Sequence, residues 1–251
     1  EEEIFLNCGR RVMPEMIDMH CHIIPGVDDG ARTKKDVREL LLMEYKSGVR
    51  HIVMTPHYRK GMFEPTEQLV KKRADYVRRE IETLGIDMKV HLGCEYHANS
   101  EMVKEFTENK RFRMNGGKFV LVEFSSRHNF VQIRNWIYEL VKAGFRPIIA
   151  HVERYRAVVD KKALVEELIE LGAWIQVDAG ALLGEQGWKL KMISRRLLKN
   201  EQIHFIGSDA HDSQRRVPNL ELCRSYVVKK MGEKYAQELF FGNPQALLKK
   251  S

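Results

Sequence analysis

The sequence has few cysteines and no long apolar run, and each scarcity excludes a class of protein. The 251 residues include four cysteines, Cys8, Cys21, Cys94 and Cys223, and none of them forms a Cys-x-x-Cys pair. A disulfide framework is therefore disfavoured, and reduced thiols in the cytoplasm are the simpler expectation. No run of about 18 uncharged apolar residues is present, so we expect no membrane span. No signal-peptide pattern opens the chain, so we expect no export.

The motifs of several enzyme classes are also absent. Cysteine-based tyrosine phosphatases use Cys-x5-Arg to place a thiolate in a phosphate cradle, but here the residues six after the cysteines are Pro14, Val27, Ser100 and Lys229. Covalent cysteine catalysis is thus excluded, because the thiolate would lack its arginine. There is neither a Walker loop nor a Gly-x-Gly-x-x-Gly fingerprint, so the sequence indicates no P-loop or dinucleotide site.

The composition is that of a globular domain with a mildly basic surface. Apolar residues make up 43% of the chain, and 42 Lys and Arg against 35 Asp and Glu give a net charge of +7. This length and apolar fraction allow one large domain with a sizeable core. The basic pairs are scattered, so we interpret them as solvated helix faces, with an acidic, phosphorylated or nucleic-acid partner as the alternative.

Residues 1–15 show no clear period, and we interpret them as an N-terminal extension, native or added for expression, that precedes a single domain at residues 16–251. From residue 16 onward, short apolar runs rich in β-branched residues alternate with longer segments of helical spacing. The predicted strands are 16–22, 51–56, 89–95, 119–124, 147–151, 174–178 and 204–208. The predicted helices are 33–47, 66–84, 99–108, 130–143, 161–171, 185–198, 219–230, 234–240 and a last one that begins at Asn243-Pro244.

Repeated strand–helix units predict an α/β fold with parallel strands and crossover helices. Thr33, with Asp36 three residues later, predicts the cap of the first helix, and Gly48 lies where that helix should end. Polar residues follow the strands all along the chain, at the ends where barrel enzymes carry their sites. A closed or nearly closed barrel is therefore favoured over an open doubly wound sheet.

Histidines and carboxylates follow six of the predicted strands. Side chains two apart on a strand share a face, so His20 and His22 should point together, as should Asp209 and His211. Leaving so many buried charges unpaired would be costly, which favours metal ions over a purely structural role. These donors exceed what one ion needs, so we expect two or three, and zinc, manganese and iron all suit the mixture. The candidates are His20, His22, Asp28, Asp29, His57, Glu95, Glu123, His151, Asp209 and His211.

Some of these residues allow a second interpretation. Asp28 and Asp29 precede a glycine, and turns also favour an Asp-Asp-Gly sequence. Asp178 ends a predicted strand, and we expect it beside the ligands rather than among them. The remaining histidines are interpreted as structural or exposed: His51, His91, His97, His128 and His204.

Arginines follow two of the histidine motifs closely. Arg154 comes three residues after His151, and Arg215-Arg216 follows His211. A guanidinium beside a metal cluster can hold a phosphate in a bidentate fork. We therefore expect these arginines to bind phosphate, and the alternative is pairing with the local acids Glu153 and Asp212.

These motifs together resemble the PHP (polymerase and histidinol phosphatase) superfamily. More closely, the chain is similar to the manganese-dependent protein-tyrosine phosphatases of Gram-positive capsule and exopolysaccharide systems, from about residue 16 to the last helix. The order and spacing of all the ligand motifs agree with that family. The motifs are Asp18-Met19-His20-Cys21-His22, Val27-Asp28-Asp29-Gly30, Thr55-Pro56-His57, Gly93-Cys94-Glu95, Val122-Glu123-Phe124, Ile149-Ala150-His151-Val152-Glu153-Arg154 and Gly207-Ser208-Asp209-Ala210-His211.

The resemblance implies a fold, a set of ligands and a substrate. The fold would be a distorted (βα)7 TIM-like barrel of the PHP type, with two or three divalent ions, manganese before iron or zinc. Arg154 and Arg216 would grip the phosphate, although Arg215 is not excluded. The substrate would be the phosphotyrosine cluster on the tail of a bacterial tyrosine kinase, in the cytoplasm, with no nucleic acid and no membrane insertion. The implied ligands are His20, His22, Glu95 and Asp209 for the first ion, Glu95, Glu123 and His151 for the second, and Asp29, His57 and His211 for the third.

We therefore expect hydrolysis of a phosphate monoester by water that the ions activate. His22, Asp209 and His211 are the candidates for moving protons. One alternative is a histidinol-phosphate phosphatase, another phosphoesterase or a nuclease on the same ions. An amide-bond hydrolase is less suited, because Glu123 stands where that class commonly has a modified lysine. A non-catalytic module that binds phosphorylated partners is the alternative of another class.

Overall fold

The computed structural model describes residues 15–249. The predicted extension lies outside the described residues except for Glu15, and so does Cys8. The strands are β1 Met16–Cys21, β2 Val49–Met54, β3 His57–Tyr58, β4 Lys89–Leu92, β5 Glu95–His97, β6 Phe119–Glu123, β7 Arg146–Ile149, β8 Trp174–Asp178 and β9 Phe205–Gly207. The helices are α1 Lys34–Lys46, α2 Glu67–Leu84, α3 Met102–Thr107, α4 Phe130–Lys142, α5 Arg156–Val159, α6 Lys162–Glu170, α7 Ala179–Leu183, α8 Trp188–Lys199, α9 Leu220–Met231, α10 Glu233–Gln237 and α11 Asn243–Leu248. Short 3-10 turns lie at η1 Met114–Gly116 and η2 Val152–Arg154, and a π-helical turn lies at η3 Glu238–Gly242.

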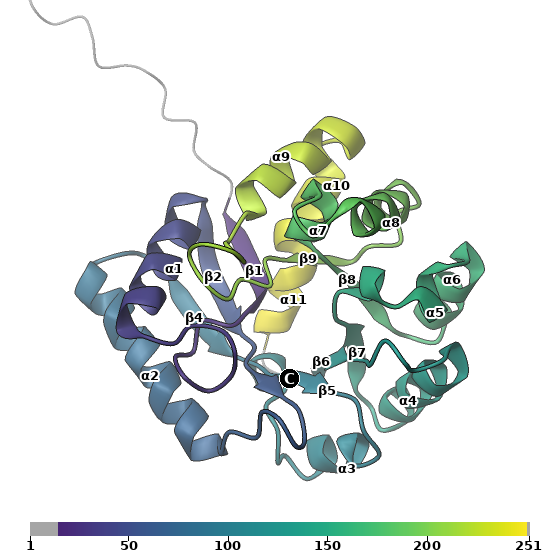
Figure 1. Cartoon of the computed structure of the whole chain (residues 1–251), viewed down its shortest axis with the longest axis horizontal. Helices are drawn as coiled ribbons and strands as arrows, with labels where there is room; N and C mark the ends of the chain where they lie inside the picture. Colours follow the sequence, from purple (N-terminus) through teal and green to yellow (C-terminus); the bar gives the residue numbers. More distant parts are fainter. Residues whose placement is uncertain (1–14, 250–251) are drawn as a thin grey trace, which may run out of the picture.

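The strands form a curled parallel sheet in two sections. One section has the order β1-β2-β4, and the other has the order β3-β5-β6-β7-β8-β9. All the pairings between these strands are parallel. Because β3 continues from β2 and β5 continues from β4 after two residues each, the first section leads into the second. The result is a mixed α/β fold, a half-barrel of strands with the helices on its outside (Figure 1).

The two ends of this sheet approach each other beside β1. Cys21 forms a parallel bridge with Ala210, which follows β9. The Asp209 amide donates a 2.8 Å hydrogen bond to the His20 carbonyl. A Cβ atom at Gly207 would lie 2.7 Å from the His20 Cβ, so the close approach of β9 to β1 requires glycine there. These contacts bring the first and last motifs of the chain together.

The predicted alternation is confirmed, but several predicted boundaries are wrong. The strand predicted at 51–56 is β2, which ends at Met54 before Pro56, a residue that cannot donate to the ladder, and the short strand β3 after it was not predicted. The strand predicted at 89–95 is divided into β4 and β5, at Gly93-Cys94. The helix predicted at 185–198 begins only at Trp188, since Gly184 and Gly187 take positive φ angles, and the helix α7 was not predicted.

Local capping signals behave as expected. Thr33 and Asp36 form the predicted capping box at the start of α1, with reciprocal side-chain to backbone hydrogen bonds. Gly48 follows the end of α1 with a φ of 92°. These signals fix where the chain turns from helix to strand, which in turn sets where each strand ends.

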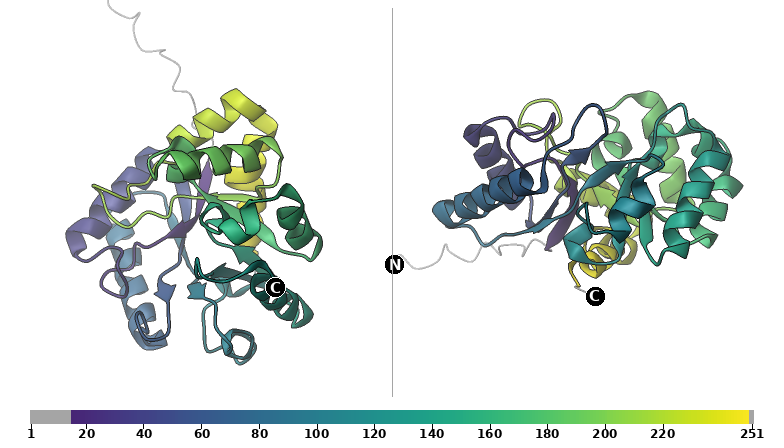
Figure 2. Two further views of the ribbon diagram at one scale, coloured as in Figure 1. Left: turned by 45° about the vertical axis from the view of Figure 1, so that its right-hand side comes forward. Right: turned by 90° about the horizontal axis from the view of Figure 1, so that it is seen from below.

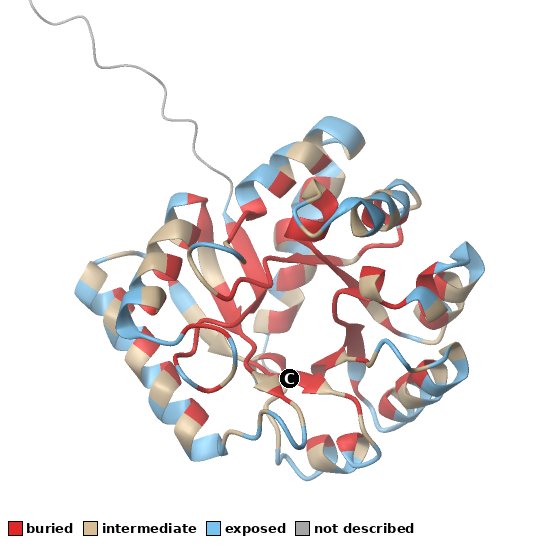
Figure 3. Cartoon of the chain, in the orientation of Figure 1, coloured by how far each residue is buried: buried red, intermediate tan, exposed pale blue. Residues whose placement is uncertain are grey.

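Two apolar cores hold the layers together. The larger lies between the sheet and the surrounding helices, and buried residues concentrate on the strands and on the inward helix faces (Figure 3). The smaller core includes Met19, Leu121, Ile148 and Phe205 from four strands, together with Leu247 of α11. In Figure 2, α11 lies on the opposite side of the sheet from the loops that follow β1 and β9. The polar ends of the strands therefore face away from the end that α11 covers.

Within the described residues, no helix combines the length and the apolarity that crossing a bilayer requires.

Candidate metal centre

Imidazoles and carboxylates from β1, β5 and the loop after β9 meet at one point. The Nε2 atoms of His20 and His22 lie 3.1 Å apart. The Oε2 atom of Glu95 lies 3.3 Å from each of these nitrogens. The Oδ1 atom of Asp209 lies 3.5 Å from the first and 3.4 Å from the second. All four side chains are buried, so four potential ligand atoms converge inside the protein.

Glu95 also faces a second group of side chains. Its Oε2 atom lies 2.8 Å from His57 Nδ1, and its Oε1 atom lies 2.7 Å from His151 Nε2. Glu123 approaches the same histidine, with 3.9 Å between its Oε1 atom and His151 Nε2. His57, Glu95 and Glu123 form a group whose ligand atoms lie within 4.8 Å of one another. Glu95 thus lies between two candidate ion positions, as a bridging carboxylate would.

A third group lies toward the mouth of the site. It consists of His22, Asp29, His57 and His211, whose ligand atoms are also within 4.8 Å of one another. Asp28, for which the sequence allowed either a ligand role or a turn role, has a different function. Its Oδ2 atom lies 2.8 Å from His22 Nδ1 and accepts a 2.9 Å hydrogen bond from the His57 backbone amide. Asp29 therefore faces the other potential ligands of this group, and Asp28 orients the His22 ring.

Several buried atoms of these groups lack hydrogen-bond partners among residues 15–249: Glu95 Oε2, Glu123 Oε2 and His211 Nε2. An unpaired buried carboxylate is costly. Burial alone would raise the pKa of Glu95, but the neighbouring His57 and His20 hold it well below its usual range. Burial and the charge of Glu95 raise the pKa of Glu123. Divalent ions would satisfy these orphaned atoms, so the residues present fit such ions.

Two supporting residues were not predicted from the sequence. The Oε1 atom of Gln176 lies 3.3 Å from His20 Nδ1 and accepts a 2.6 Å hydrogen bond from the His151 amide. The Tyr155 hydroxyl lies 3.0 Å from His151 Nδ1. Both hold imidazole rings by the nitrogen that faces away from the cluster. The position of Gln176, two residues before Asp178 on β8, was an available signal, because both side chains share a face.

A fourth buried group contains Asp18, and both carboxylate oxygens of its Glu44 lack hydrogen-bond partners among residues 15–249. Asp18 accepts hydrogen bonds from the Ser208 amide at 3.0 Å, from the Ser208 hydroxyl at 2.6 Å and from the His20 amide at 3.2 Å. Glu44 and Cys21 complete the group, and burial raises the pKa of Asp18 and of Glu44. These contacts tie β1 to the loop after β9 and so hold His20 in place.

Two arginines reach the cluster from outside. Arg154 donates from Nη2 to Asp178 Oδ2 at 2.5 Å and to Asp209 Oδ2 at 2.7 Å. Arg216 donates to the same Asp209 oxygen. Asp209 therefore presents one oxygen to the histidines and the other to the guanidinium groups. Asp178, expected beside the candidate ligands, is a hydrogen-bond partner of Arg154.

The local acids considered as arginine partners do not take that role. Glu153 accepts a hydrogen bond from the backbone of Asp178, and Asp212 accepts from the backbone of Arg215. Arg215 lines a separate hollow beside α1, whereas Arg216 lines the hollow above the cluster. The two neighbouring arginines therefore line two different hollows.

Two residues of the site adopt the left-handed backbone region that non-glycine residues rarely occupy. His151 has a φ of 32°, and Asp209 has a φ of 53°. Each comes two residues after the end of a strand, β7 or β9, and the side chains of both reach the cluster. Such outliers gather at functional sites because surrounding contacts impose them.

The mouth of the site is a hollow of about 250 Å³ with one apolar wall. Arg59 and Phe63 exchange two backbone hydrogen bonds of 2.8 Å, which closes a short hairpin. The Phe63 ring stacks on His57 with 5.5 Å between centroids and 9° between planes. Met62, at the tip of the hairpin, is 60% exposed and lines the same hollow. The other walls are imidazoles, carboxylates and guanidinium groups.

A curled α/β sheet with such a cluster at the carboxyl ends of its strands is an arrangement typical of metal-dependent hydrolases. The family described as "Capsular polysaccharide synthesis, CpsB/CapC" matches residues 16–249. The chain belongs to this family, and the family predicted from the sequence motifs is confirmed.

Characterised relatives cover most of the chain. The tyrosine-protein phosphatase CpsB of Streptococcus pneumoniae is 32% identical over 238 residues, which are 93% of this chain and 98% of that protein. The tyrosine-protein phosphatase YwqE of Bacillus subtilis is 34% identical over 201 residues, 80% of this chain and 79% of that protein. A crystal structure from work on YwqE and CpsB, described as unique metal-dependent tyrosine phosphatases, matches with a TM-score of 0.87 and 32% identity over 93% of this chain and 94% of that chain.

Proposed function

We propose that this protein is a metal-dependent phosphatase that hydrolyses phosphotyrosine in a protein substrate. The observation that carries the proposal is one hollow that joins three elements: a buried cluster of metal-binding groups, two arginines and an apolar wall. The cluster suits activation of water, the arginines suit a phosphate, and the wall suits an aromatic ring. The names of the curated relatives support the same activity.

The ions are assigned to three positions. The first belongs to His20, His22, Glu95 and Asp209, the second to Glu95, Glu123 and His151, and the third to Asp29, His57 and His211. The converging ligand atoms and the orphaned atoms of Glu95, Glu123 and His211 support this assignment. Manganese is the proposed ion, with iron and zinc as the alternatives that the same donors suit.

Divalent ions, when bound, lower the pKa of water toward neutrality and polarise phosphoryl oxygens. The protein supplies the remaining charge stabilisation through Arg154 and Arg216. Both guanidinium groups reach the cluster at Asp209, so a phosphate at the mouth of the site lies within their reach. Asp178 fixes Arg154, which leaves the other guanidinium N–H groups to donate to equatorial phosphoryl oxygens.

Asp209 serves better as a ligand than as a proton donor. Burial alone would raise its pKa, but the charges of His20, Arg216 and Arg154 hold the pKa of this carboxyl well below its usual range. It therefore stays ionised at neutral pH. His22 has its Nδ1 atom bound to Asp28 and its Nε2 atom in the cluster, which also favours a ligand role. A phenolate, with a phenol pKa of about 10, leaves with less acid assistance than an alkoxide.

The apolar wall favours an aryl phosphate over an alkyl phosphate. The Arg59–Phe63 hairpin is closed by its backbone hydrogen bonds and by a 2.7 Å hydrogen bond from the Gly61 amide to Glu64. Because it is braced, it can present Met62 and Phe63 to a substrate ring at little entropic cost. Phosphoserine has no ring to cover these side chains.

Met62→Ala is therefore expected to raise KM for a phosphotyrosine peptide about 5–10-fold. A methionine side chain that the substrate ring partly covers contributes roughly 1 kcal/mol to the binding free energy. Its effect on a phosphoserine peptide or on an alkyl phosphate should stay within about twofold. Steady-state kinetics on the paired substrates measure the difference. Met192→Ala is the matched control, since Met192 is an exposed methionine of α8 outside the hollow. An equal loss on both substrates would show that the hairpin does not select aryl groups.

The proposed activity is tested by presenting competing substrates side by side. Phosphotyrosine peptide, phosphoserine peptide, L-histidinol phosphate and single-stranded DNA are assayed with the same metal-loaded enzyme. We expect the highest kcat/KM on the phosphotyrosine peptide. A higher value on histidinol phosphate or cleavage of DNA would support the alternative phosphoesterases. Absence of phosphate release, with partner binding that survives His151→Ala, would support the non-catalytic module.

The proposal also includes the closed form of the barrel, the substrate protein and the location in the cell. The distorted (βα)7 barrel is supported by the bridge between Cys21 and Ala210, which links the first strand to the segment after the last. The substrate protein is proposed to be a phosphotyrosine-bearing bacterial tyrosine kinase of capsule synthesis. A cytoplasmic location fits the buried free thiols of Cys21, Cys94 and Cys223.

A further inference from the structure

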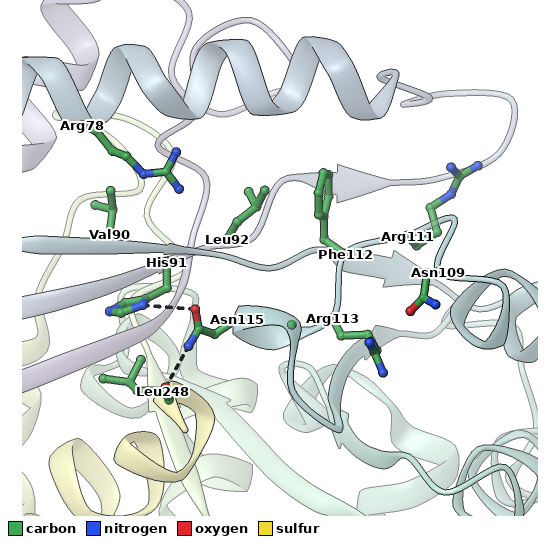
Figure 4. Close-up of a pocket in the computed structure, with 11 residues that line it drawn as sticks. Arg78, Val90, His91, Leu92, Asn109, Arg111, Phe112, Arg113, Asn115 and Leu248 are labelled. Carbon is green, nitrogen blue, oxygen red and sulfur yellow. Dashed lines mark hydrogen bonds between the residues drawn. The ribbon is translucent and has the colours of Figure 1, made fainter. Parts of the chain in front are cut away.

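A second hollow, larger than the catalytic one, lies beside β4. Its volume is about 660 Å³. Arg78 of α2 lies on one side, β4 forms the floor, and residues 109–116 with Leu248 form the other side (Figure 4). We call this hollow the β4 groove. None of the proposed metal ligands lines it.

The β4 groove is cationic. Its lining contains Arg78, Arg111 and Arg113 and no carboxylate among the residues that the structure describes. Arg111 is held in place by Glu105 and lies over the Tyr58 ring, with 3.6 Å from its guanidinium carbon to the ring centroid. Arg78 pairs with the exposed Asp75 of its own helix, so among residues 15–249 Arg113 is the arginine of this lining that has no carboxylate partner. The groove therefore favours an anionic occupant.

The floor of the groove is a free sheet edge. β4 ends its section of the sheet, so no described strand pairs with its outer edge. The 3-10 turn η1 borders the groove opposite this edge, and its Asn115 bonds to His91 and to the Leu248 carbonyl at one end of the groove. Val90 and Leu92 are only partly buried. An extended peptide can pair with such an edge through its backbone and cover these apolar side chains.

The groove lies next to the catalytic hollow. A small crevice between them is lined by Arg111 and Phe112, which also line the groove, and by His57, which also lines the catalytic hollow. Arg111 stacks on Tyr58, the residue after His57. A single polypeptide can therefore reach both hollows along one flank of the protein.

We infer that the β4 groove is a docking site for an extended acidic segment of the phosphotyrosine-bearing substrate protein. The inference rests on the proposed function. The segment lies along β4 as an added strand, and its carboxylates pair with Arg78, Arg111 and Arg113. A free strand edge with apolar flanks suits a peptide better than a nucleic acid, which has no backbone N–H groups to pair with the edge. A concave groove also suits a peptide better than a flat lipid surface.

The test compares a phosphotyrosine peptide with two extended versions of it. In each extended version a flexible linker joins eight glutamates to the peptide, at the N-terminus in one and at the C-terminus in the other. For the wild-type protein, the extension is expected to lower KM about tenfold without changing kcat. The double charge reversal Arg78→Glu and Arg113→Glu should remove this gain. p-Nitrophenyl phosphate is too small to extend from the catalytic hollow into the groove, so its turnover should stay within twofold of the wild type in every variant.

Arg79→Glu is the matched control, because Arg79 lies on the same helix, is exposed and does not line the groove. An equal loss in this variant would assign the effect to general surface charge and would overturn the inference, as would an unchanged gain in the double variant. Arg113→Gln repeats the measurement if the double variant does not fold.

Direct binding separates this inference from the proposed function. Fluorescence anisotropy of a labelled, unphosphorylated glutamate-rich peptide is measured with the metal-loaded wild type and the variants. Binding that the double reversal weakens at least tenfold supports the groove even if the wild type fails to hydrolyse phosphotyrosine. Absence of peptide binding, or stronger binding of single-stranded RNA at the same residues, overturns it.

Discussion

Glu95→Gln is expected to lower kcat/KM for a phosphotyrosine peptide at least about 10³-fold and to reduce the metal content of the protein. Glu95 faces His20 and His22 on one side and His57 and His151 on the other. A neutral amide cannot bridge two cations as a carboxylate does. Metal ions contribute several kcal/mol to such transition states, and each ~1.4 kcal/mol is a factor of ten in rate. Elemental analysis and steady-state kinetics on the same preparation measure both effects.

Glu153→Gln is the matched control for this prediction. Glu153 is also fully buried, and burial and the neighbouring Asp178 raise its pKa well above the usual range. Because this environment favours the neutral carboxyl, glutamine is the substitution that disturbs it least, and activity should stay within about threefold. Chelation of the wild type should abolish turnover, and metal add-back should restore it. Full activity of metal-depleted protein, or of Glu95→Gln, would contradict the metal assignment.

Arg154→Lys and Arg216→Lys are each expected to lower kcat/KM about 10²–10³-fold while the metal content stays unchanged. Lysine keeps the charge but not the planar fork that binds two phosphoryl oxygens. Loss of one donor to transition-state charge costs roughly this much in other enzymes. Inhibition by inorganic phosphate should weaken in both variants. Kinetics with p-nitrophenyl phosphate suffice for the measurement, because this effect does not depend on the protein part of the substrate.

The control for the arginines is the other member of the doublet. Arg215 lines the hollow beside α1 and does not line the catalytic one, so Arg215→Lys should remain within about twofold of the wild type. If Arg215→Lys loses as much activity as Arg216→Lys, the assignment of the phosphate to Arg216 is wrong. If the metal content falls in Arg154→Lys, that arginine acts through Asp209 rather than on the phosphate.

The alternation of strands and helices could be predicted because it is a local property. Periods of two and of about 3.6 residues are visible in short windows, and Thr33 and Gly48 mark ends of elements chemically. The early end of one strand, the division of another and the break before α8 were missed. These boundaries depend on Pro56 and on the glycines around α7. They also depend on which neighbouring backbone is available for pairing, and only the assembled sheet decides that.

The candidate ligands could also be predicted, since parallel strands place their carboxyl ends at one edge. The roles within the site are less local. Asp28 and Asp29 are neighbours of the same type, yet one orients His22 and the other faces the cluster. For Gln176 the only sequence signal is its place two residues before Asp178 on one strand face. Tyr155 has a common residue type and belongs to none of the ligand motifs, so nothing in the sequence separates it from an ordinary loop residue.

The sequence by itself determined the chemistry available to this protein: the histidines and acids at the strand ends, the missing cysteine motif and the family to which the chain belongs. The tertiary structure decided which of these groups lie close to one another. It placed Glu95 between two groups of histidines, turned Arg216 inward and Arg215 outward, and left the edge of β4 free. These arrangements depend on contacts between residues far apart in the chain, and such contacts form only when the sheet curls and its first and last strands meet.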